Sequence, residues 1–203
     1  PVVIDIGAHI GDTACLIKSL KSDARVFSFE PNPKTYKQLS RTAKKYGFTS
    51  YNLGVGDKPG KLTLYDSLSG SSPFASFYPG AINLHGREMT KYTVSLTTMD
   101  IFHTKNIPGK SIDLLKIDVE GHELAVFKGS QQIIKRKLVK AVLFEFNSMN
   151  IQSRTFFADY VKLMKNYDLY RLLPKGMIAL SDTSILQNEI FAYQNIVAII
   201  KHL

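Results

Sequence analysis

Residues 2–30 read VVIDIGAHIGDTACLIKSLKSDARVFSFE, and this stretch decides the fold class. Its first five residues, apart from Asp5, are apolar and β-branched, which predicts a buried strand over 2–6. A glycine-bearing turn and a helical stretch over 12–22 follow, and a second apolar run over 25–30 ends in Glu30. A strand, a helix and another strand in this order indicate a βαβ unit with two parallel strands.

The rest of the chain repeats this alternation. Strands that alternate with helices of about 10–15 residues favour a parallel sheet covered by helices on both faces. The sequence therefore predicts an α/β fold with a doubly wound, mostly parallel, Rossmann-like sheet. We expect further strands over 48–55, 112–119, 140–146, 169–174 and 191–200, and helices over 34–45, 122–136 and 154–167.

Residues 61–98 interrupt this rhythm. The runs 61–65 and 92–98 alternate between apolar and polar residues, which predicts the two arms of a β-hairpin. Between them, residues 66–91 are rich in Ser, Gly and Pro and show no sustained period. Connections of this length in compact domains are usually functional lids or disordered segments, and both readings carry equal weight here. We expect one domain over 1–203 with this insertion at about 66–91.

Composition bounds the remaining possibilities. The chain has 203 residues, 44% of them hydrophobic, and a formal net charge of +9. Its single cysteine, Cys15, excludes an internal disulfide and is typical of a reducing, cytoplasmic compartment. No apolar run reaches the roughly 18 residues of a membrane span, and no signal peptide is visible. The densest basic stretch, Lys34 to Lys45, has its charges opposite an apolar stripe, so nucleic acid is an unlikely partner.

The turn after the first strand predicts a nucleoside ligand. Gly7 and Gly11 allow close backbone approach, but His9 and Asp12 break the dinucleotide fingerprint where a pyrophosphate would bind. Asp5 adds a carboxylate suited to an amino group, and Glu30, about 20 residues on, is placed to accept hydrogen bonds from ribose hydroxyls. This combination favours S-adenosylmethionine (SAM), an adenosine that carries an amino group and no phosphates.

Several sequence blocks resemble the FkbM-type methyltransferases. These blocks are VVIDIGAHIGDTA, FSFEPNP, NLGVGDKPG, TMDIF, IDLLKIDVEGHELAVFKG and VLFEFN, within residues 2–147. The resemblance implies the seven-stranded class I methyltransferase fold, SAM as cofactor, and methylation of a hydroxyl oxygen. Carried over residue by residue, it implies a cofactor site made of Asp5, Gly7, His9, Gly11, Glu30, Asn32, Asn52, Gly54, Val55 and Asp118.

The ends of two neighbouring predicted strands carry the reactive-site hypothesis. Asp118 follows one strand, and Glu145 and Asn147 end the next. An alcohol acceptor must lose a proton, so we expect a base, with Asp118 favoured and His122 and Glu145 as the other catalytic candidates. A less favoured alternative is that Asp118, Glu145 and Asn147 hold Mg²⁺. These acids also fit a purely structural role as helix caps.

The sequence therefore predicts a SAM-dependent methyltransferase that acts on a hydroxyl of a small molecule or sugar. Two alternatives stay open. The first is an RNA 2′-O-methyltransferase, which the basic charge balance permits. The second is a SAM-binding module without catalysis. The acceptor, the metal dependence and the oligomeric state are not determined by the sequence.

Overall fold

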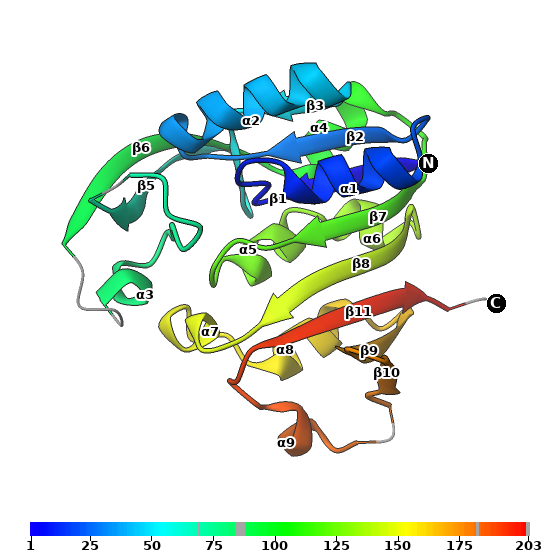
Figure 1. The fold of residues 1–203 in the computed structure, drawn as a ribbon. Coiled ribbons are helices and arrows are strands. Elements are labelled where there is room, and N and C mark those ends of the chain that lie inside the picture. Colours follow the sequence, from blue (N-terminus) through cyan, green and yellow to red (C-terminus); the bar gives the residue numbers. More distant parts are fainter. Residues whose placement is uncertain (69, 84–87, 182, 202–203) are drawn as a thin grey trace.

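The computed structural model describes residues 1–68, 70–83, 88–181 and 183–201. Its main feature is an eight-stranded sheet with the strand order β10-β9-β11-β8-β7-β1-β2-β3 (Figure 1). The strands are β1 (Val2–Ile6), β2 (Arg25–Phe29), β3 (Thr49–Tyr51), β7 (Ile112–Ile117), β8 (Val139–Phe146), β9 (Tyr167–Leu173), β10 (Gly176–Ala179) and β11 (Gln194–Ile200).

The pairing confirms the predicted doubly wound, mainly parallel sheet. β3, β2, β1, β7 and β8 pair in parallel, and β11, β9 and β10 add antiparallel strands beyond β8. The sheet contains one strand more than the seven expected, because β10 forms a hairpin with β9 at the edge. The strand order switches direction at β1, with β2 and β3 on one side of it and β7 and β8 on the other, and ligands bind at such switch points in open α/β sheets.

Helices cover both faces of the sheet because side chains alternate along each strand. Val3 and Val26 pack against α1 (Asp12–Leu20), while Ile4 and Phe27 belong to the larger core on the opposite face. That larger core receives α4 (Met99–Asn106), α5 (Glu123–Lys128), α6 (Gln131–Lys135) and α8 (Phe157–Leu163). Its centre is aromatic, with Phe127, Phe144 and Tyr160 in mutual ring contact.

Two predicted elements are divided in the structure. The strand expected over 48–55 separates into β3 and β4 (Gly54–Val55), because Asn52 between them donates hydrogen bonds to the carbonyls of Glu30 and Pro31 and redirects the chain. The helix expected over 122–136 breaks between α5 and α6 at Gly129. A Cβ at Gly129 would lie 2.0 Å from the carbonyl oxygen of Gly56, so the backbones approach there too closely for a continuous helix of ordinary residues.

The predicted hairpin forms the frame of the insertion. β5 (Gly60–Ser67) pairs antiparallel with β6 (Met89–Thr97), and β4 completes a separate three-stranded sheet. A short helix, α3 (Pro79–Asn83), lies between the arms, and the described part of the insertion extends beyond the carboxyl ends of the parallel strands (Figure 1). Residues 69 and 84–87 of the predicted lid lie outside the described residues. The remaining short helices are α7 (Met149–Gln152) and α9 (Ile185–Asn188).

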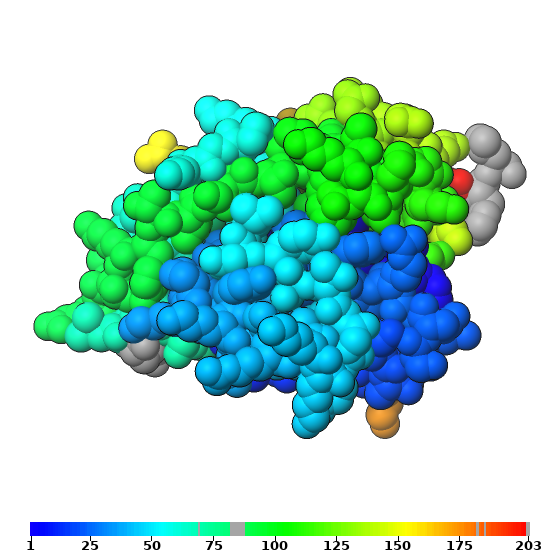
Figure 2. Space-filling view, turned by 90° about the horizontal axis from the view of Figure 1, so that it is seen from above, coloured from blue at the N-terminus to red at the C-terminus, as the bar shows by residue number. Residues whose placement is uncertain are grey.

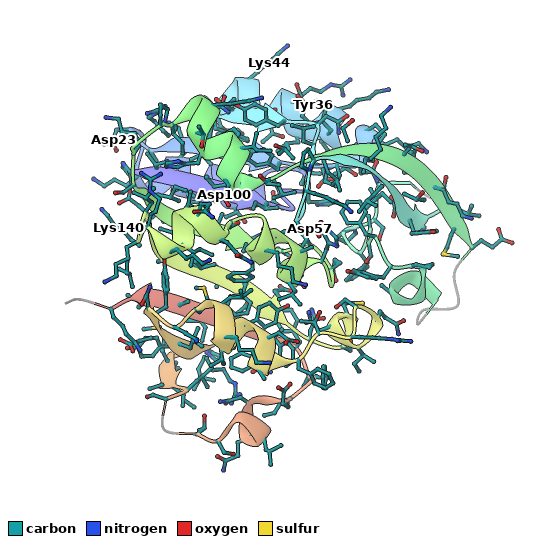
Figure 3. The ribbon with its side chains drawn as sticks, turned by 180° about the vertical axis from the view of Figure 1, so that it is seen from behind. Asp23, Tyr36, Lys44, Asp57, Asp100 and Lys140 are labelled. Carbon is teal, nitrogen blue, oxygen red and sulfur yellow. The ribbon has the colours of Figure 1, made fainter. Side chains whose placement is uncertain are left out.

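The basic helix α2 (Pro33–Tyr46) begins at Asn32, whose side chain accepts from the Lys34 amide, and ends at Gly47. Thr35, Leu39 and Ala43 are its buried residues, and the helix forms part of the surface seen in Figure 2. Lys44 extends from this helix away from the molecule (Figure 3). Among the described residues, none of the helices combines the length and apolar character that a bilayer crossing requires.

Candidate functional site

A cavity of about 370 Å³ opens at the carboxyl ends of the central strands. Its walls come from the turn after β1, the end of β2, β4, the loop after β7, the end of β8 and the insertion. The residues that line the cavity include Gly7, His9, Glu30, Gly54, Val55, Ser72, Phe74, Phe77, Lys116, Asp118, Glu120, Glu145 and Tyr193. Of the predicted site residues, Asp5, Gly11, Asn32, Asn52 and His122 do not line the cavity.

The glycine turn brings β1 and β7 into close backbone contact. Gly7 has φ 77°, and a Cβ there would lie 1.7 Å from the carbonyl oxygen of Asp118. Only glycine fits this position without displacing the loop that carries Asp118. His9 also has a positive φ, 48°, and its amide points to the end of β2. The turn thereby leaves room for a ligand to approach the backbone and aligns the ends of three strands.

Glu30 lies at the end of β2 in a largely buried position. Its two carboxylate oxygens accept hydrogen bonds from the amide of His9 (3.0 Å) and the amide of Asn32 (2.8 Å). Burial raises the pKa of Glu30 to about 7, and the two amide donors only partly oppose this effect. Each oxygen keeps a second lone pair, so the carboxylate remains able to accept from a ligand in the cavity.

Asn32 links this wall to the insertion. Its side-chain amide donates to Asp66 of β5 (2.8 Å) and to the carbonyl of Gly70 (3.2 Å). Asp66 is fully buried and also accepts from the amides of Ser67 and Ser72. Asn32 therefore acts from behind the cavity: it fixes the segment that places Ser72 and the following residues in the cavity wall.

Two ion pairs connect the buried Asp5 to Lys116 and Asp118 in the cavity wall. The ammonium of Lys116 on β7 lies 3.3 Å from Asp5 Oδ1 and 3.1 Å from Asp118 Oδ2. Asp5 has no exposed surface, and burial raises its pKa while Lys116 opposes that rise. Burial also acts to lower the pKa of Lys116, but the two carboxylates together hold it above its usual value. Lys116 thus serves as the shared counter-ion of both acids.

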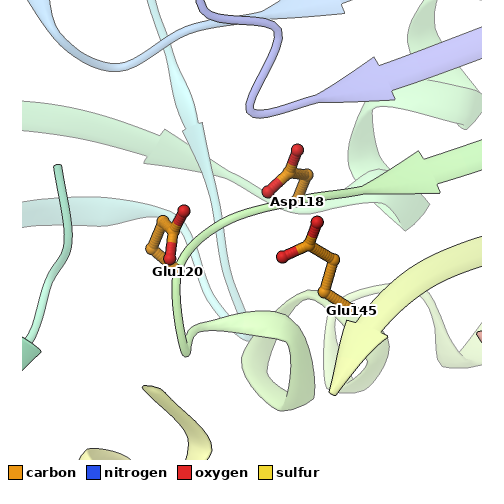
Figure 4. A group of neighbouring side chains, drawn as sticks. All are labelled: Asp118, Glu120 and Glu145. Carbon is orange, nitrogen blue, oxygen red and sulfur yellow. The ribbon is translucent and has the colours of Figure 1, made fainter. Parts of the chain in front are cut away.

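Three carboxylates, one of them that of Asp118, lie close together in the cavity wall. Asp118 ends the β7 segment, Glu120 lies in the loop after it, and Glu145 ends β8; their side chains face a common space in Figure 4. One oxygen of each lies within 4.8 Å of the others, a spacing that also suits a divalent cation. Glu145 accepts hydrogen bonds from the Tyr193 hydroxyl (2.8 Å) and from the Asn147 amide (3.2 Å).

His122 lies outside the cavity. Its Nδ1 is 3.3 Å from the Tyr78 hydroxyl, and its ring contacts Phe77, so it packs between α5 and the insertion. Burial lowers its pKa to about 4, which keeps the ring neutral near pH 7. The structure does not bring His122 together with Asp118 and Glu145. Asn147 contributes indirectly, through its hydrogen bond to Glu145.

The structure adds site residues that the sequence analysis did not assign a catalytic or cofactor-binding role. Glu120 belongs to the same sequence block as Asp118, and that block could have indicated Glu120 as a site residue. Tyr193 precedes the last strand and has no motif around it; only the tertiary structure places it beside Glu145. Phe74 and Phe77 come from the insertion, whose sequence shows no period.

The residues present fit an adenosine ligand that carries an amino group. A cavity with a backbone-accessible glycine turn at one wall and a carboxylate at the end of the second strand suits an adenosine with free ribose hydroxyls. The carboxylates beyond the turn suit a positively charged group rather than phosphates. Together with the strand order, these features define the class of Rossmann-like methyltransferase folds.

The chain belongs to the FkbM methyltransferase family, since the model of the "Methyltransferase FkbM domain" matches residues 5–171. The hexuronic acid methyltransferase AglP of Haloferax volcanii is 33% identical over 131 residues, which cover 63% of this chain and 49% of that protein. The 2-O-methyltransferase NoeI of Sinorhizobium fredii is 21% identical over 190 residues, covering 87% and 76%. This chain thus spans about half the length of AglP.

A solved structure shows the same fold. The FkbM methyltransferase of Methylobacillus flagellatus superposes with a TM-score of 0.58 at 15% identity, over 97% of this chain and 42% of that one. The likeness confirms the class I methyltransferase architecture that the resemblance to the FkbM-type methyltransferases implied.

Proposed function

We propose that this protein transfers a methyl group from SAM to a hydroxyl oxygen of a small molecule or sugar. The observation that carries this proposal is that one cavity is lined by Glu30, by the glycine turn at Gly7 and by three carboxylates. These carboxylates belong to Asp118, Glu120 and Glu145. The relatives support it, because two of them are named as a hexuronic acid methyltransferase and a 2-O-methyltransferase.

The proposed roles follow the order of residues along this wall. When bound, SAM supplies an electrophilic methyl group on a sulfonium. Glu30 accepts hydrogen bonds from the ribose hydroxyls, and Gly7 leaves the space that the methionine part of the ligand needs. Gly54 and Val55 line the side expected for adenine. The carboxylates beyond Gly7 face the acceptor and receive its proton.

The insertion and Tyr193 form the acceptor side of the proposed site. Phe74 and Phe77 present aromatic surface to the cavity, and Tyr193 stands at its mouth with its hydroxyl on Glu145. Aromatic faces and carboxylates together suit a polyhydroxylated ligand, whose rings offer both apolar C–H faces and hydroxyl donors.

The test combines binding with turnover. SAM and S-adenosylhomocysteine (SAH) binding are measured by calorimetry, and SAH formation is then followed with a panel of methyl hexosides, methyl hexuronides and small alcohols. SAH formation with at least one hydroxyl compound supports the proposal. Binding of SAM without turnover of any compound or of RNA would leave the alternative of a non-catalytic module, and absence of SAM binding would reject both.

The Glu30→Ala variant should bind SAM about 30-fold more weakly, a loss of about 2 kcal/mol, because charged hydrogen bonds to both ribose hydroxyls disappear. Calorimetry on the folded variant checks this. Since burial raises the pKa of Glu30 to about 7, the wild-type affinity should fall as the pH drops below that value. The matched control is Asp23→Ala, an exposed acid at the opposite edge of the molecule (Figure 3). Equal affinities of wild type and Glu30→Ala would remove Glu30 from the cofactor site.

Reversing two charges of the basic helix tests the RNA alternative. Lys37 and Arg41 are exposed on α2 and lie outside the cavity lining. Their joint replacement by Glu should leave turnover of the best small acceptor within about twofold, because solvated surface charges contribute little at physiological salt. A large loss of activity that low salt restores would instead favour a nucleic-acid substrate.

A further inference from the structure

The three carboxylates at the acceptor end of the cavity differ in their protein partners. Asp118 forms an ion pair with Lys116, and Glu145 accepts hydrogen bonds from Tyr193 and Asn147. Within the described part of the chain, the carboxylate of Glu120 has neither a hydrogen-bond donor nor an ion-pair partner. Both of its carboxylate oxygens are therefore free to accept a proton from a ligand, whereas Asp118 has one oxygen, Oδ2, on Lys116, and both oxygens of Glu145 accept hydrogen bonds.

The backbone holds Glu120 in an unusual conformation. Its φ is 51°, in the left-handed region that residues with a Cβ seldom adopt. The Ser76 hydroxyl from the insertion donates to the Glu120 carbonyl (2.7 Å), and Glu123 accepts from the amides of Val119 and Gly121 (3.2 Å each). Strained residues that several contacts hold in place occur often at active sites. These contacts fix Glu120 in the cavity wall.

We propose that Glu120 is the catalytic base of the methyl transfer. This inference rests on the proposed function and assigns its proton-accepting step to one residue. As the acceptor oxygen forms its bond to the methyl carbon, the carbon–sulfur bond breaks and its electron pair stays on the sulfur, which gives SAH. The hydroxyl proton passes to the Glu120 carboxylate and then to solvent. Asp118 and Glu145 act as positioning residues around it.

The charges around Glu120 suit this role. The groups that face it are Asp118 and Lys116 from β7 and its end, Glu145 from β8, and Glu123 from α5. Burial, followed by the three neighbouring acids, raises the pKa of Glu120 to about 8, and Lys116 opposes the rise. A base whose pKa lies near the working pH is the most effective one for proton transfer.

The first test compares Glu120→Gln with the control Asp23→Asn, an exposed acid outside the insertion and the cavity lining. With the methyl hexoside or hexuronide that gives the highest wild-type rate, Glu120→Gln should lower kcat by about 10² to 10⁴-fold and abolish the acidic limb of the pH–rate profile. Glu120→Asp should retain that limb at a reduced rate, because it keeps a carboxylate. Asp23→Asn should behave like the wild type, and all variants should keep the wild-type Tm and SAH affinity.

The second test needs no acceptor. Because the Glu120 carboxylate faces the transferred methyl in this proposal, it favours the cationic SAM over the neutral SAH. Calorimetry above pH 8 should show that Glu120→Gln lowers this preference roughly threefold or more, since it removes a charge beside the sulfonium. An unchanged preference would place the carboxylate away from the methyl and overturn the proposal.

Two other outcomes overturn the proposal. A kcat of Glu120→Gln within about threefold of the wild type, with a large loss in Asp118→Asn, would give the role of base to Asp118. Wild-type turnover that EDTA abolishes and Mg²⁺ restores would make the three acids metal ligands. Failure of the proposed function looks different, because the wild type itself would then bind no SAM or turn over no hydroxyl compound.

Discussion

A Gly7→Ala variant should lose roughly 3 kcal/mol or more of its free energy of unfolding and should no longer bind SAM. Two effects add. A residue with a Cβ at φ 77° costs about 1–2 kcal/mol. The new Cβ also lies 1.7 Å from the Asp118 carbonyl oxygen, and relieving such an overlap in a packed site costs about 1–3 kcal/mol. The displaced loop is the one that carries Asp118 and Glu120.

Gly47→Ala is the matched control for this prediction. Gly47 has a similar φ, 72°, but a Cβ there would meet nothing within 4 Å. It should therefore lose only the conformational part, about 1–2 kcal/mol, and keep the wild-type SAM affinity. Urea unfolding followed by circular dichroism, together with calorimetry of SAM binding, measures both variants. Equal losses in the two variants would show that the close approach of β1 and β7 does not constrain Gly7.

Lys116→Met should destabilise the fold by about 3–5 kcal/mol, because it leaves the buried carboxylate of Asp5 without its counter-ion. The side chain keeps a similar length, so the loss comes from the charge rather than from a cavity. Urea unfolding near pH 8 measures the loss. The same variant should also lower turnover, since Asp118 loses the ammonium that orients it.

The double variant Lys116→Met with Asp5→Asn separates charge from shape. Asparagine carries no charge at the buried position, so the double variant should regain most of the lost stability. The loss of stability in Lys116→Met should also depend on pH. Without Lys116, the folded-state pKa of Asp5 rises further above its unfolded value. The destabilisation is therefore fully present above that raised pKa. It disappears as the pH falls and Asp5 becomes protonated in both the folded and the unfolded state. A single variant as stable as the wild type at pH 8 would contradict a structural role of the pair.

The prediction of the fold succeeded where local pattern and long-range structure agree. The runs at 2–6, 25–30 and 140–146 are apolar and β-branched, and each forms a central parallel strand close to the expected bounds. The hairpin of β5 and β6 was likewise visible as a period of two. The divisions at Asn52 and Gly129 were not visible, because hydrogen bonds and backbone approaches from distant segments cause them.

The prediction of the site was uneven for the same reason. Asp118 and Glu145 line the cavity together, because parallel strands end at the same edge of a sheet and the sequence shows which residues end them. His122 follows Asp118 closely in the sequence but packs against Phe77 and Tyr78 of the insertion. Glu120 and Gly121 both have positive φ values and turn the chain between Asp118 and His122. Closeness in the sequence therefore did not predict the direction of the His122 side chain.

The sequence by itself determined the sheet, the glycine turn and the acids at the strand ends, because short-range periodicity and turn chemistry fix these features. The family followed from the sequence blocks that resemble the FkbM-type methyltransferases. The tertiary structure alone decided how each acid is partnered. Lys116 reaches both Asp5 and Asp118, Tyr193 comes to Glu145 from 48 residues away, and Glu120 is left without a donor among the described residues. These pairings depend on the register of β7 against β1 and of β11 against β8, which no local pattern encodes.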